Sequence, residues 1–276
     1  MKLTVSVLLS VYADERPERL WLSLLSIARQ TRLPDQLVLV HDGQLGPELD
    51  AVIDRFTRIP FVPMHQVRLQ SNRGLIEALN RGIPRCTGDF VMRMDSDDLC
   101  MPNRLEAQVA FLESHPEVDV VGTAMYEFTH NSDTPEHIKP VREDHDEIAV
   151  LLPWRNPVNH ATACVRRTLL HGGYPNLRFL EDYYLWVKLL GKGARFHNLD
   201  QPLYVCRFDD RTFARRSGKE NFQNEVWLRW HMWKLGLMSV ITLAVVTTAQ
   251  TVLRFGPLGL QRWLWARARV PYLPQA

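Results

Sequence analysis

Cysteine is scarce in this sequence, which has only four such residues among 276. They lie far apart, at Cys86, Cys100, Cys164 and Cys206, and no two of them have the CxxC spacing typical of a zinc site. We therefore expect reduced, mostly buried thiols in a cytosolic protein.

An excess of charge of either sign is also absent. Lys and Arg number 33 and Asp and Glu 31, which gives a formal net charge of +2. This balance offers no argument for nucleic-acid binding, so we expect no nucleic-acid partner. Internal repeats and low-complexity segments are missing as well, and a hydrophobic content of 46% is enough to bury a proper core.

Apolar runs and helical periodicity alternate along the first hundred residues. The predicted strands cover residues 4–12, 36–40, 64–69 and a run that starts at residue 90. The predicted helices between them cover residues 16–30, 48–57 and 75–83. This order is typical of a doubly wound, mostly parallel α/β sheet of Rossmann-like type, which binds ligands outside the carboxyl ends of its strands. Tyr12, Asp42 and Asp95 all follow such ends, so we expect them to meet in one crevice.

The first strand has an alternative interpretation. Lys2 and the apolar run up to Ala13 also fit a short signal peptide cleaved after Ala13. The run is rich in valine and interrupted by serine, which favours a strand.

The pattern continues beyond residue 100 with less regularity. It predicts a helix at 102–115, a strand at 118–128 interrupted by Gly122, a loop at 129–141, a helix at 144–152 and a strand at 161–166. A helix opening at 179–182 and two short strands at 194–199 and 203–208 follow.

Three carboxylates follow the predicted strand that begins at Phe90. Asp95, Asp97 and Asp98 lie within four residues, and Pro102 comes shortly after them. Carboxylates crowded at a sheet edge repel one another unless a cation lies between them, and such oxygen-rich sites suit Mg²⁺ or Mn²⁺. A metal held there commonly clamps a diphosphate. In the alternative, Asp98 caps the helix entering at Pro102 and the other two are solvated turn residues.

The tail, residues 221–276, differs from the rest of the chain. No charged residue occurs between Lys234 and Arg254, and the segment 258–270 places tryptophan beside arginine. Such a mixture favours helices that lie in a membrane interface. A single membrane span and packing against the preceding domain remain alternatives.

The order of these motifs resembles family 2 glycosyltransferases of the GT-A type. The resemblance is carried by residues 5–12, 26–43, 72–83 and 88–98, and it covers roughly residues 3–220. Within that family, the chain is most similar to bacterial exopolysaccharide transferases of the amylovoran-biosynthesis kind. The resemblance implies a GT-A catalytic domain at 1–220, with a nucleotide-sugar half at 1–100 and an acceptor half at 101–220.

The resemblance also implies roles on the donor side. Residues that would bind the nucleotide diphosphate sugar are Tyr12, Glu15, Asp42, Arg73, Asp95 and Arg207. Tyr12 would lie along the base, Asp42 would hydrogen-bond the base or ribose, and Asp95 would contact both ribose and metal. Asp97 would bind the Mg²⁺ or Mn²⁺ that offsets charge on the leaving diphosphate.

Ordinary structural roles compete with several of these assignments. Asp42 also fits a turn before Gly43, and Glu15 fits a helix cap. Arg207 belongs to a basic cluster with arginines at 211, 215 and 216 that fits a solvated face or a contact with anionic lipid equally well.

On the acceptor side, the resemblance assigns the catalytic base to Asp182. Transfer with inversion is a direct displacement at the anomeric carbon, so the acceptor hydroxyl must lose a proton as it attacks. Glu181 and Asp182 also fit simple caps of the helix that they open. His160 would touch acceptor or diphosphate, or be a satisfied core histidine. The chain lacks the Gln-x-x-Arg-Trp block of processive members, which favours addition of a single sugar.

These implications combine into an expected enzyme on the cytosolic face of the cell membrane. It would move one sugar, with UDP-sugars as the favoured donors, to a lipid-linked glycan of exopolysaccharide or O-antigen synthesis. The tail would hold it at the membrane surface. Transfer to polyprenyl phosphate itself, or nucleotide binding without turnover, are the alternatives.

Overall fold

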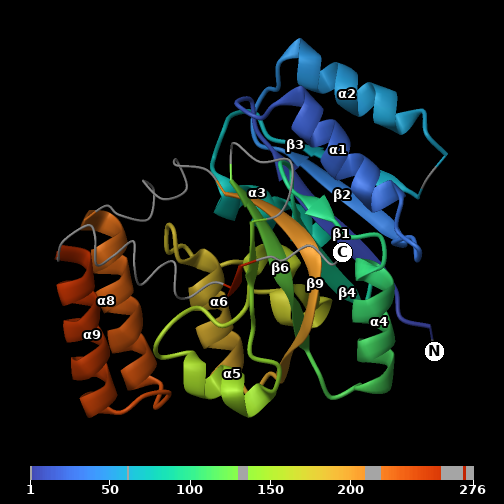
Figure 1. Cartoon of the computed structure of the whole chain (residues 1–276). Helices are drawn as coiled ribbons and strands as arrows, with labels where there is room; N and C mark the ends of the chain where they lie inside the picture. Colours follow the sequence, from blue (N-terminus) through green and yellow to red (C-terminus); the bar gives the residue numbers. More distant parts are fainter. Residues whose placement is uncertain (1, 61, 130–135, 209–218, 256–269, 272–276) are drawn as a thin grey trace.

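The computed structural model describes residues 2–60, 62–129, 136–208, 219–255 and 270–271. A single mixed β-sheet runs through it, with helices on both faces (Figure 1). Four neighbouring strands form its parallel part, in the order β3 (Met64–Arg68), β2 (Gln36–His41), β1 (Val5–Val11) and β4 (Phe90–Asp95). The expected doubly wound α/β arrangement is thus present in the first hundred residues.

The rest of the sheet departs from the mostly parallel arrangement that we predicted. The strand β8 (Cys164–Arg166) pairs antiparallel with β4, and β6 (Val120–Thr129) pairs antiparallel with β8. Along β6 runs β9 (Phe196–Phe208), in parallel. The second half of the sheet is therefore mixed, with β8 antiparallel to both of its neighbours.

Two short strands predicted at 194–199 and 203–208 are one strand, β9. Its register against β6 shifts where Leu199 pairs with Thr123 and Pro202 with Ala124, so Asp200 and Gln201 form an irregularity rather than a break. This irregularity, with Pro202 beside it, produced the wrong prediction. Gly122 does not interrupt β6 either, because its missing side chain leaves space for Asn198.

The predicted loop at 129–141 contains a short strand, β7 (His137–Lys139), that pairs with β6; residues 130–135 lie outside the described part. Two residues, β5 (Leu99–Cys100), form an unpredicted strand against β9. The predicted helix at 258–270 lies outside the described residues except for Val270, which is in β10 (Val270–Pro271). The strand predicted at 161–166 starts only at Cys164, after a 3-10 turn.

Helices on the two faces bury two separate cores. The first face is covered by α1 (Pro17–Ala28), α2 (Pro47–Thr57) and α4 (Arg104–Ser114), whose leucines and isoleucines pack on β1, β2 and β4. The second is covered by α3 (Leu75–Gly82), α5 (His145–Leu151) and α6 (Glu181–Leu190). Because strands alternate their side chains, Leu8 faces one core and Leu9 the other.

The tail begins with two helices, α8 (Lys219–Lys234) and α9 (Val240–Phe255), which lie side by side at one end of the molecule (Figure 1). Leu228 and Met232 of α8 are buried in the α6 core, and Trp227 packs edge-on against Tyr184 of α6. The first helix of the tail, α8, thus packs against the preceding domain. Among the described helices, none combines the length and apolarity needed to cross a bilayer.

Candidate active site

The carboxyl ends of β1, β2 and β4 meet at one edge of the sheet, as the sequence predicted. Ser10 pairs with Asp95, and Val11 pairs with His41. Just beyond that edge, the Asp42 amide donates to the Val11 carbonyl at 2.8 Å. Tyr12, with 39% of its surface exposed, follows directly after β1. Residues far apart in the sequence thus lie at one edge of the sheet.

The loop after β4 gathers carboxylates at this edge. Ser96 donates to Glu15 Oε2 at 2.6 Å, which brings Glu15 of the β1–α1 connection to Asp95 and Asp97. Burial, then the negative charges of Asp95 and Glu15, raise the pKa of Asp97 to about 6. These charges disfavour one another in the absence of a cation.

The donor set of this loop fits Mg²⁺ or Mn²⁺. Both are hard cations that bind through one or two carboxylates and complete their shell with water and substrate phosphates. The described residues contain no group of three or more metal-binding side chains, so Asp95 and Asp97 would need oxygens from elsewhere. A bound diphosphate would be one source of such oxygens.

Asp98 points inward and holds the loop in place. It is only 3% exposed, and its Oδ1 accepts the Arg207 amide of β9 at 2.7 Å. Arg207 also donates from Nε to the Asp97 carbonyl at 2.9 Å, so its side chain lies against the same loop. The alternative that Asp98 caps the next helix is wrong, because α4 begins at Arg104 after Asn103.

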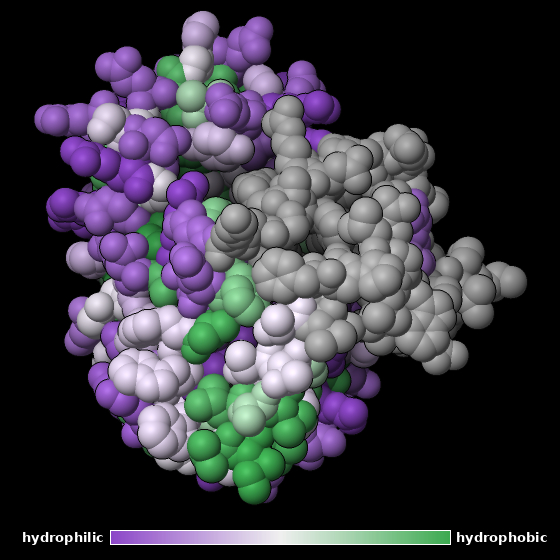
Figure 2. Space-filling view, turned by 90° about the vertical axis from the view of Figure 1, so that its left-hand side faces the viewer, coloured by the Kyte–Doolittle hydropathy of each residue, from purple (hydrophilic) through white to green (hydrophobic). Residues whose placement is uncertain are grey.

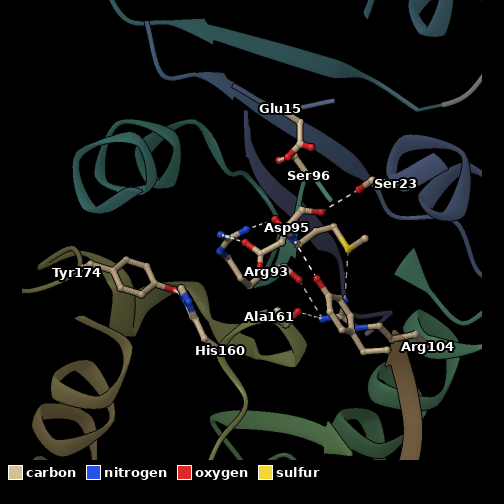
Figure 3. Close-up of polar contacts among 11 residues, drawn as sticks. Glu15, Ser23, Arg93, Asp95, Ser96, Arg104, His160, Ala161 and Tyr174 are labelled. Atoms are coloured by element: carbon tan, nitrogen blue, oxygen red, sulfur yellow. Dashed lines mark hydrogen bonds and ion pairs between the residues drawn. The ribbon is translucent and has the colours of Figure 1, made fainter. Parts of the chain in front are cut away.

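A buried arginine lies directly behind the carboxylates, and our sequence analysis missed it. Arg93 of β4 is 3% exposed, and its Nη2 contacts Asp95 Oδ1 at 2.5 Å (Figure 3). On its other side, Arg104 of α4 donates to the Arg93 carbonyl at 3.0 Å. The signal was present, because a charged residue inside an otherwise apolar buried strand requires an opposite charge nearby.

His160 and Tyr174 continue this network on the far side of Arg93 (Figure 3). His160 Nε2 and the Tyr174 hydroxyl share a hydrogen bond of 2.9 Å. Burial, and then the Arg93 charge, hold the pKa of His160 well below its usual value, so the ring is neutral. His160 is therefore hydrogen-bonded within the protein, and its contact with acceptor or diphosphate stays a prediction.

Asp42 organises the turn that precedes α3. It is 5% exposed, and its two carboxylate oxygens accept the backbone amides of Arg73 at 2.6 Å and Gly74 at 2.9 Å. Gly43 has a φ of 91°, and a Cβ there would meet the Asn72 nitrogen at 2.6 Å. The two loops therefore pack backbone to backbone, and Asp42 fixes the backbone that carries Arg73. Its contact with a nucleotide stays a prediction.

Asp182 opens α6 and is oriented by a residue of a distant loop. Asn156 Nδ2 donates to Asp182 Oδ2 at 2.7 Å. Burial, and then the adjacent Asp182 charge, raise the pKa of the neighbouring Glu181 to about 7. Burial raises the pKa of the Tyr174 hydroxyl, Arg93 opposes that rise, and the charges of Asp182, Glu181 and Asp95 add to it, so these three carboxylates lie near the same hydroxyl.

Comparison with known proteins identifies the family of this chain. The sequence pattern of the family described as "Glycosyl transferase family 2" matches residues 6–172. The chain belongs to glycosyltransferase family 2. The resemblance seen in the sequence is thus confirmed, and the mixed α/β sheet with a parallel first half agrees with the GT-A fold.

Two relatives of this family 2 glycosyltransferase match nearly its whole length. The amylovoran biosynthesis glycosyltransferase AmsE of Erwinia amylovora is 34% identical over 266 residues, covering 96% of this chain and 98% of the relative. An Escherichia coli protein, the UDP-Gal:alpha-D-GlcNAc-diphosphoundecaprenol beta-1,3-galactosyltransferase, is 30% identical over 264 residues, covering 95% of each chain.

Among solved structures, the mannosyltransferase PcManGT from Pyrobaculum calidifontis, in complex with GDP-Man and Mn²⁺, has the same fold. The TM-score is 0.60 at 20% identity, over 97% of this chain and 80% of the other.

Proposed function

We propose that this glycosyltransferase moves a single sugar, with inversion, from a UDP-sugar to a lipid-linked diphosphate glycan. The observation that carries the proposal is that two sets of carboxylates, from the end of β4 and from the start of α6, lie near the same buried tyrosine, Tyr174. Asp95 and Asp97 lie at the end of β4, and Asp182 opens α6. The pKa of Tyr174 is raised first by burial and then by carboxylates of both groups, Asp182 and Asp95 among them. The galactosyltransferase relative, whose name states a UDP-sugar and a diphosphoundecaprenol acceptor, supports these substrate classes.

On this proposal the donor lies along the carboxyl ends of β1, β2 and β4. Tyr12, Glu15, Asp42 and Arg73 would bind the nucleoside, and Arg207 would face the diphosphate. Asp95 and Asp97 would hold Mg²⁺ or Mn²⁺, which neutralises the charge that builds on the leaving diphosphate. Arg93 fixes Asp95 from behind, through the 2.5 Å contact, so that this carboxylate does not rotate away.

The chemical step needs one proton acceptor on the other side of the sugar. Asp182 would take the proton from the acceptor hydroxyl as its oxygen attacks the anomeric carbon. The bond from that carbon to the diphosphate oxygen breaks, and the nucleoside diphosphate leaves with both electrons. Asn156 holds one Asp182 oxygen at 2.7 Å and thereby aims the carboxylate.

Transfer itself tests this proposal. The purified chain is incubated with Mn²⁺, UDP-galactose, UDP-glucose or UDP-N-acetylglucosamine, and a synthetic lipid-linked N-acetylglucosamine diphosphate, and products are separated by mass. We expect one added hexose or N-acetylhexosamine with one of these donors. Polyprenyl phosphate is tested as a second acceptor under the same conditions. Transfer to it alone would favour the alternative function, in which polyprenyl phosphate itself accepts the sugar. Binding of UDP without turnover on any acceptor would favour a non-catalytic nucleotide-binding protein.

We also propose that the α8–α9 pair rests on a membrane surface. Figure 2 shows apolar and pale residues gathered on the lower part of one face, over these two helices. Trp230, Trp233, Leu235, Val240 and Ile241 are between 40% and 73% exposed there. Tryptophan beside aliphatic side chains suits the boundary between headgroups and acyl chains.

Binding to lipid vesicles tests the membrane contact. We expect the protein to sediment with vesicles that contain anionic lipid, and Ile241→Asp to weaken that binding by roughly tenfold or more, because a carboxylate resists burial in the interface. Val150→Asp is the matched control, since Val150 is 72% exposed on α5, outside the patch. Equal binding by both variants would contradict the proposal.

A further inference from the structure

A groove with an excess of arginine runs along α3, apart from the carboxylate loop. Its volume is about 1200 Å³, and one wall comes from the end of β3 and from α3 while the other comes from residues 176–181. Five arginines line it, at positions 68, 73, 81, 85 and 178, against two acids, Glu77 and Glu181. The groove is therefore positive in a protein whose overall charge is nearly balanced.

Three of these arginines have no ion pair among the described residues: Arg68, whose guanidinium donates to the neutral Gln66 at 2.8 Å, Arg73 and Arg85. Arg81 pairs with Glu77 at 2.7 Å and Arg178 with Glu220 at 3.6 Å. In the part of the chain that the structure describes, the guanidinium groups of Arg73 and Arg85 form no hydrogen bond or ion pair. Unpaired guanidinium groups that line one concave surface are suited to phosphate oxygens.

Apolar side chains share the groove with these charges. Val67, Leu69, Leu75, Ile76 and Phe179 also line it. Phe179 has a φ of 70°, the only left-handed backbone among the described residues other than glycine, and Arg178 stacks over its ring at 4.7 Å. Such strain persists where the surroundings hold it and is common at ligand clamps. The mixture of guanidinium and hydrocarbon suits an anionic ester with an apolar chain better than a free anion.

We propose that this groove binds the diphosphate of the lipid-linked acceptor, together with the first part of its hydrocarbon chain. The inference rests on the proposed function, because it takes the acceptor to be a diphosphate ester. Within the groove lies Glu181, next to the proposed base Asp182, so a sugar attached to the bound diphosphate is directed to the reacting region. Of the residues that would hold the donor, Arg73 lines the groove, whereas Asp95, Asp97 and Arg207, which would hold the donor diphosphate, do not.

The lipid side of the groove is also consistent with the position of α8. Asn224 of α8 donates to the Arg178 carbonyl at 3.0 Å, and Glu220 pairs with the Arg178 side chain. One wall of the groove is thus tied to the helix pair that carries the exposed tryptophans.

Binding of geranyl diphosphate in the presence of saturating UDP and Mn²⁺ tests this proposal on the full chain. We expect it to bind while the donor site is filled, and Arg85→Gln to weaken binding by roughly tenfold, the effect of losing one charged hydrogen bond. Arg58→Gln is the matched control, because Arg58 is exposed at the end of α2 and lies outside the groove; it should bind normally. A thermal melt of each variant verifies folding.

Inorganic pyrophosphate distinguishes the lipid from a free anion, and we expect it to bind more weakly than geranyl diphosphate. Displacement of geranyl diphosphate by UDP, equal binding of pyrophosphate, or unchanged binding by Arg85→Gln would each overturn the assignment. None of these measurements requires turnover. A failure of sugar transfer is thus seen separately from a failure of the groove.

Discussion

Replacing Asp182 by Asn should lower the rate of sugar transfer by about 10³-fold while leaving the affinity for UDP unchanged. General base catalysis contributes about 10²- to 10⁴-fold, and the amide cannot accept the proton of the attacking hydroxyl. The substitution keeps the size of the side chain, and the amide oxygen of Asn can still accept the hydrogen bond from Asn156. Single-turnover kinetics with bound donor separate the chemical step from binding.

The neighbouring carboxyl supplies the control for this prediction. Glu181→Gln removes the group whose pKa is raised to about 7 by burial and by Asp182, but keeps Asp182 itself. We expect it to retain most of the chemical rate. The opposite outcome, a large loss with Glu181→Gln and near-normal turnover with Asp182→Asn, would show that Glu181 is the base. Near-normal turnover of both variants would favour a charged acceptor such as polyprenyl phosphate, which needs no base.

Replacing Asp97 by Asn should abolish the dependence of UDP binding on Mn²⁺ and lower transfer by about 10²- to 10³-fold. The metal offsets several kcal/mol of charge on the leaving diphosphate, and Asp97 is its expected ligand. Asp98→Asn, one residue away, is the matched control, since the buried Asp98 accepts the Arg207 amide, as an Asn oxygen also can. Loss of metal dependence in Asp98→Asn but not in Asp97→Asn would reverse the two roles.

The same site predicts how metal binding changes with pH. Burial, Asp95 and Glu15 raise the pKa of Asp97 to about 6, so below that pH the carboxyl carries a proton that a cation must displace. The concentration of Mn²⁺ needed for half-maximal UDP binding should therefore rise by up to about tenfold per pH unit below pH 6. It should be nearly constant above pH 7, where Asp97 is ionised.

Part of the site could be predicted because parallel strands place their carboxyl ends together. Tyr12, Asp42 and Asp95 were expected to meet from strand order alone, and the register of β1, β2 and β4 brings the ends of these strands to one edge of the sheet. The buried pair of Arg93 and Asp95 was missed, although Arg93 interrupts an apolar run. In an isolated sequence, such a residue is also compatible with a strand edge facing solvent.

Features built from distant segments could not be predicted in the same way. The groove joins arginines at 68–85 to Arg178, and no local pattern shows that these segments face each other. The contact depends on Asn80, whose side chain bonds both the amide and the carbonyl of Tyr174, at 2.6 and 3.1 Å. Similarly, the hydrogen bonds from Arg73 and Gly74 to Asp42 depend on a loop packing that only the folded chain specifies.

Calorimetric titration of the wild-type chain with UDP, with and without Mn²⁺, tests the central claim most directly. We propose that the sheet edge at the ends of β1, β2 and β4 is a metal-dependent site for a nucleoside diphosphate. We therefore expect UDP to bind at least about tenfold more tightly with Mn²⁺, and a chelator to reverse the gain. UDP binding that is equal with and without the metal, or no binding of UDP under either condition, would contradict this proposal.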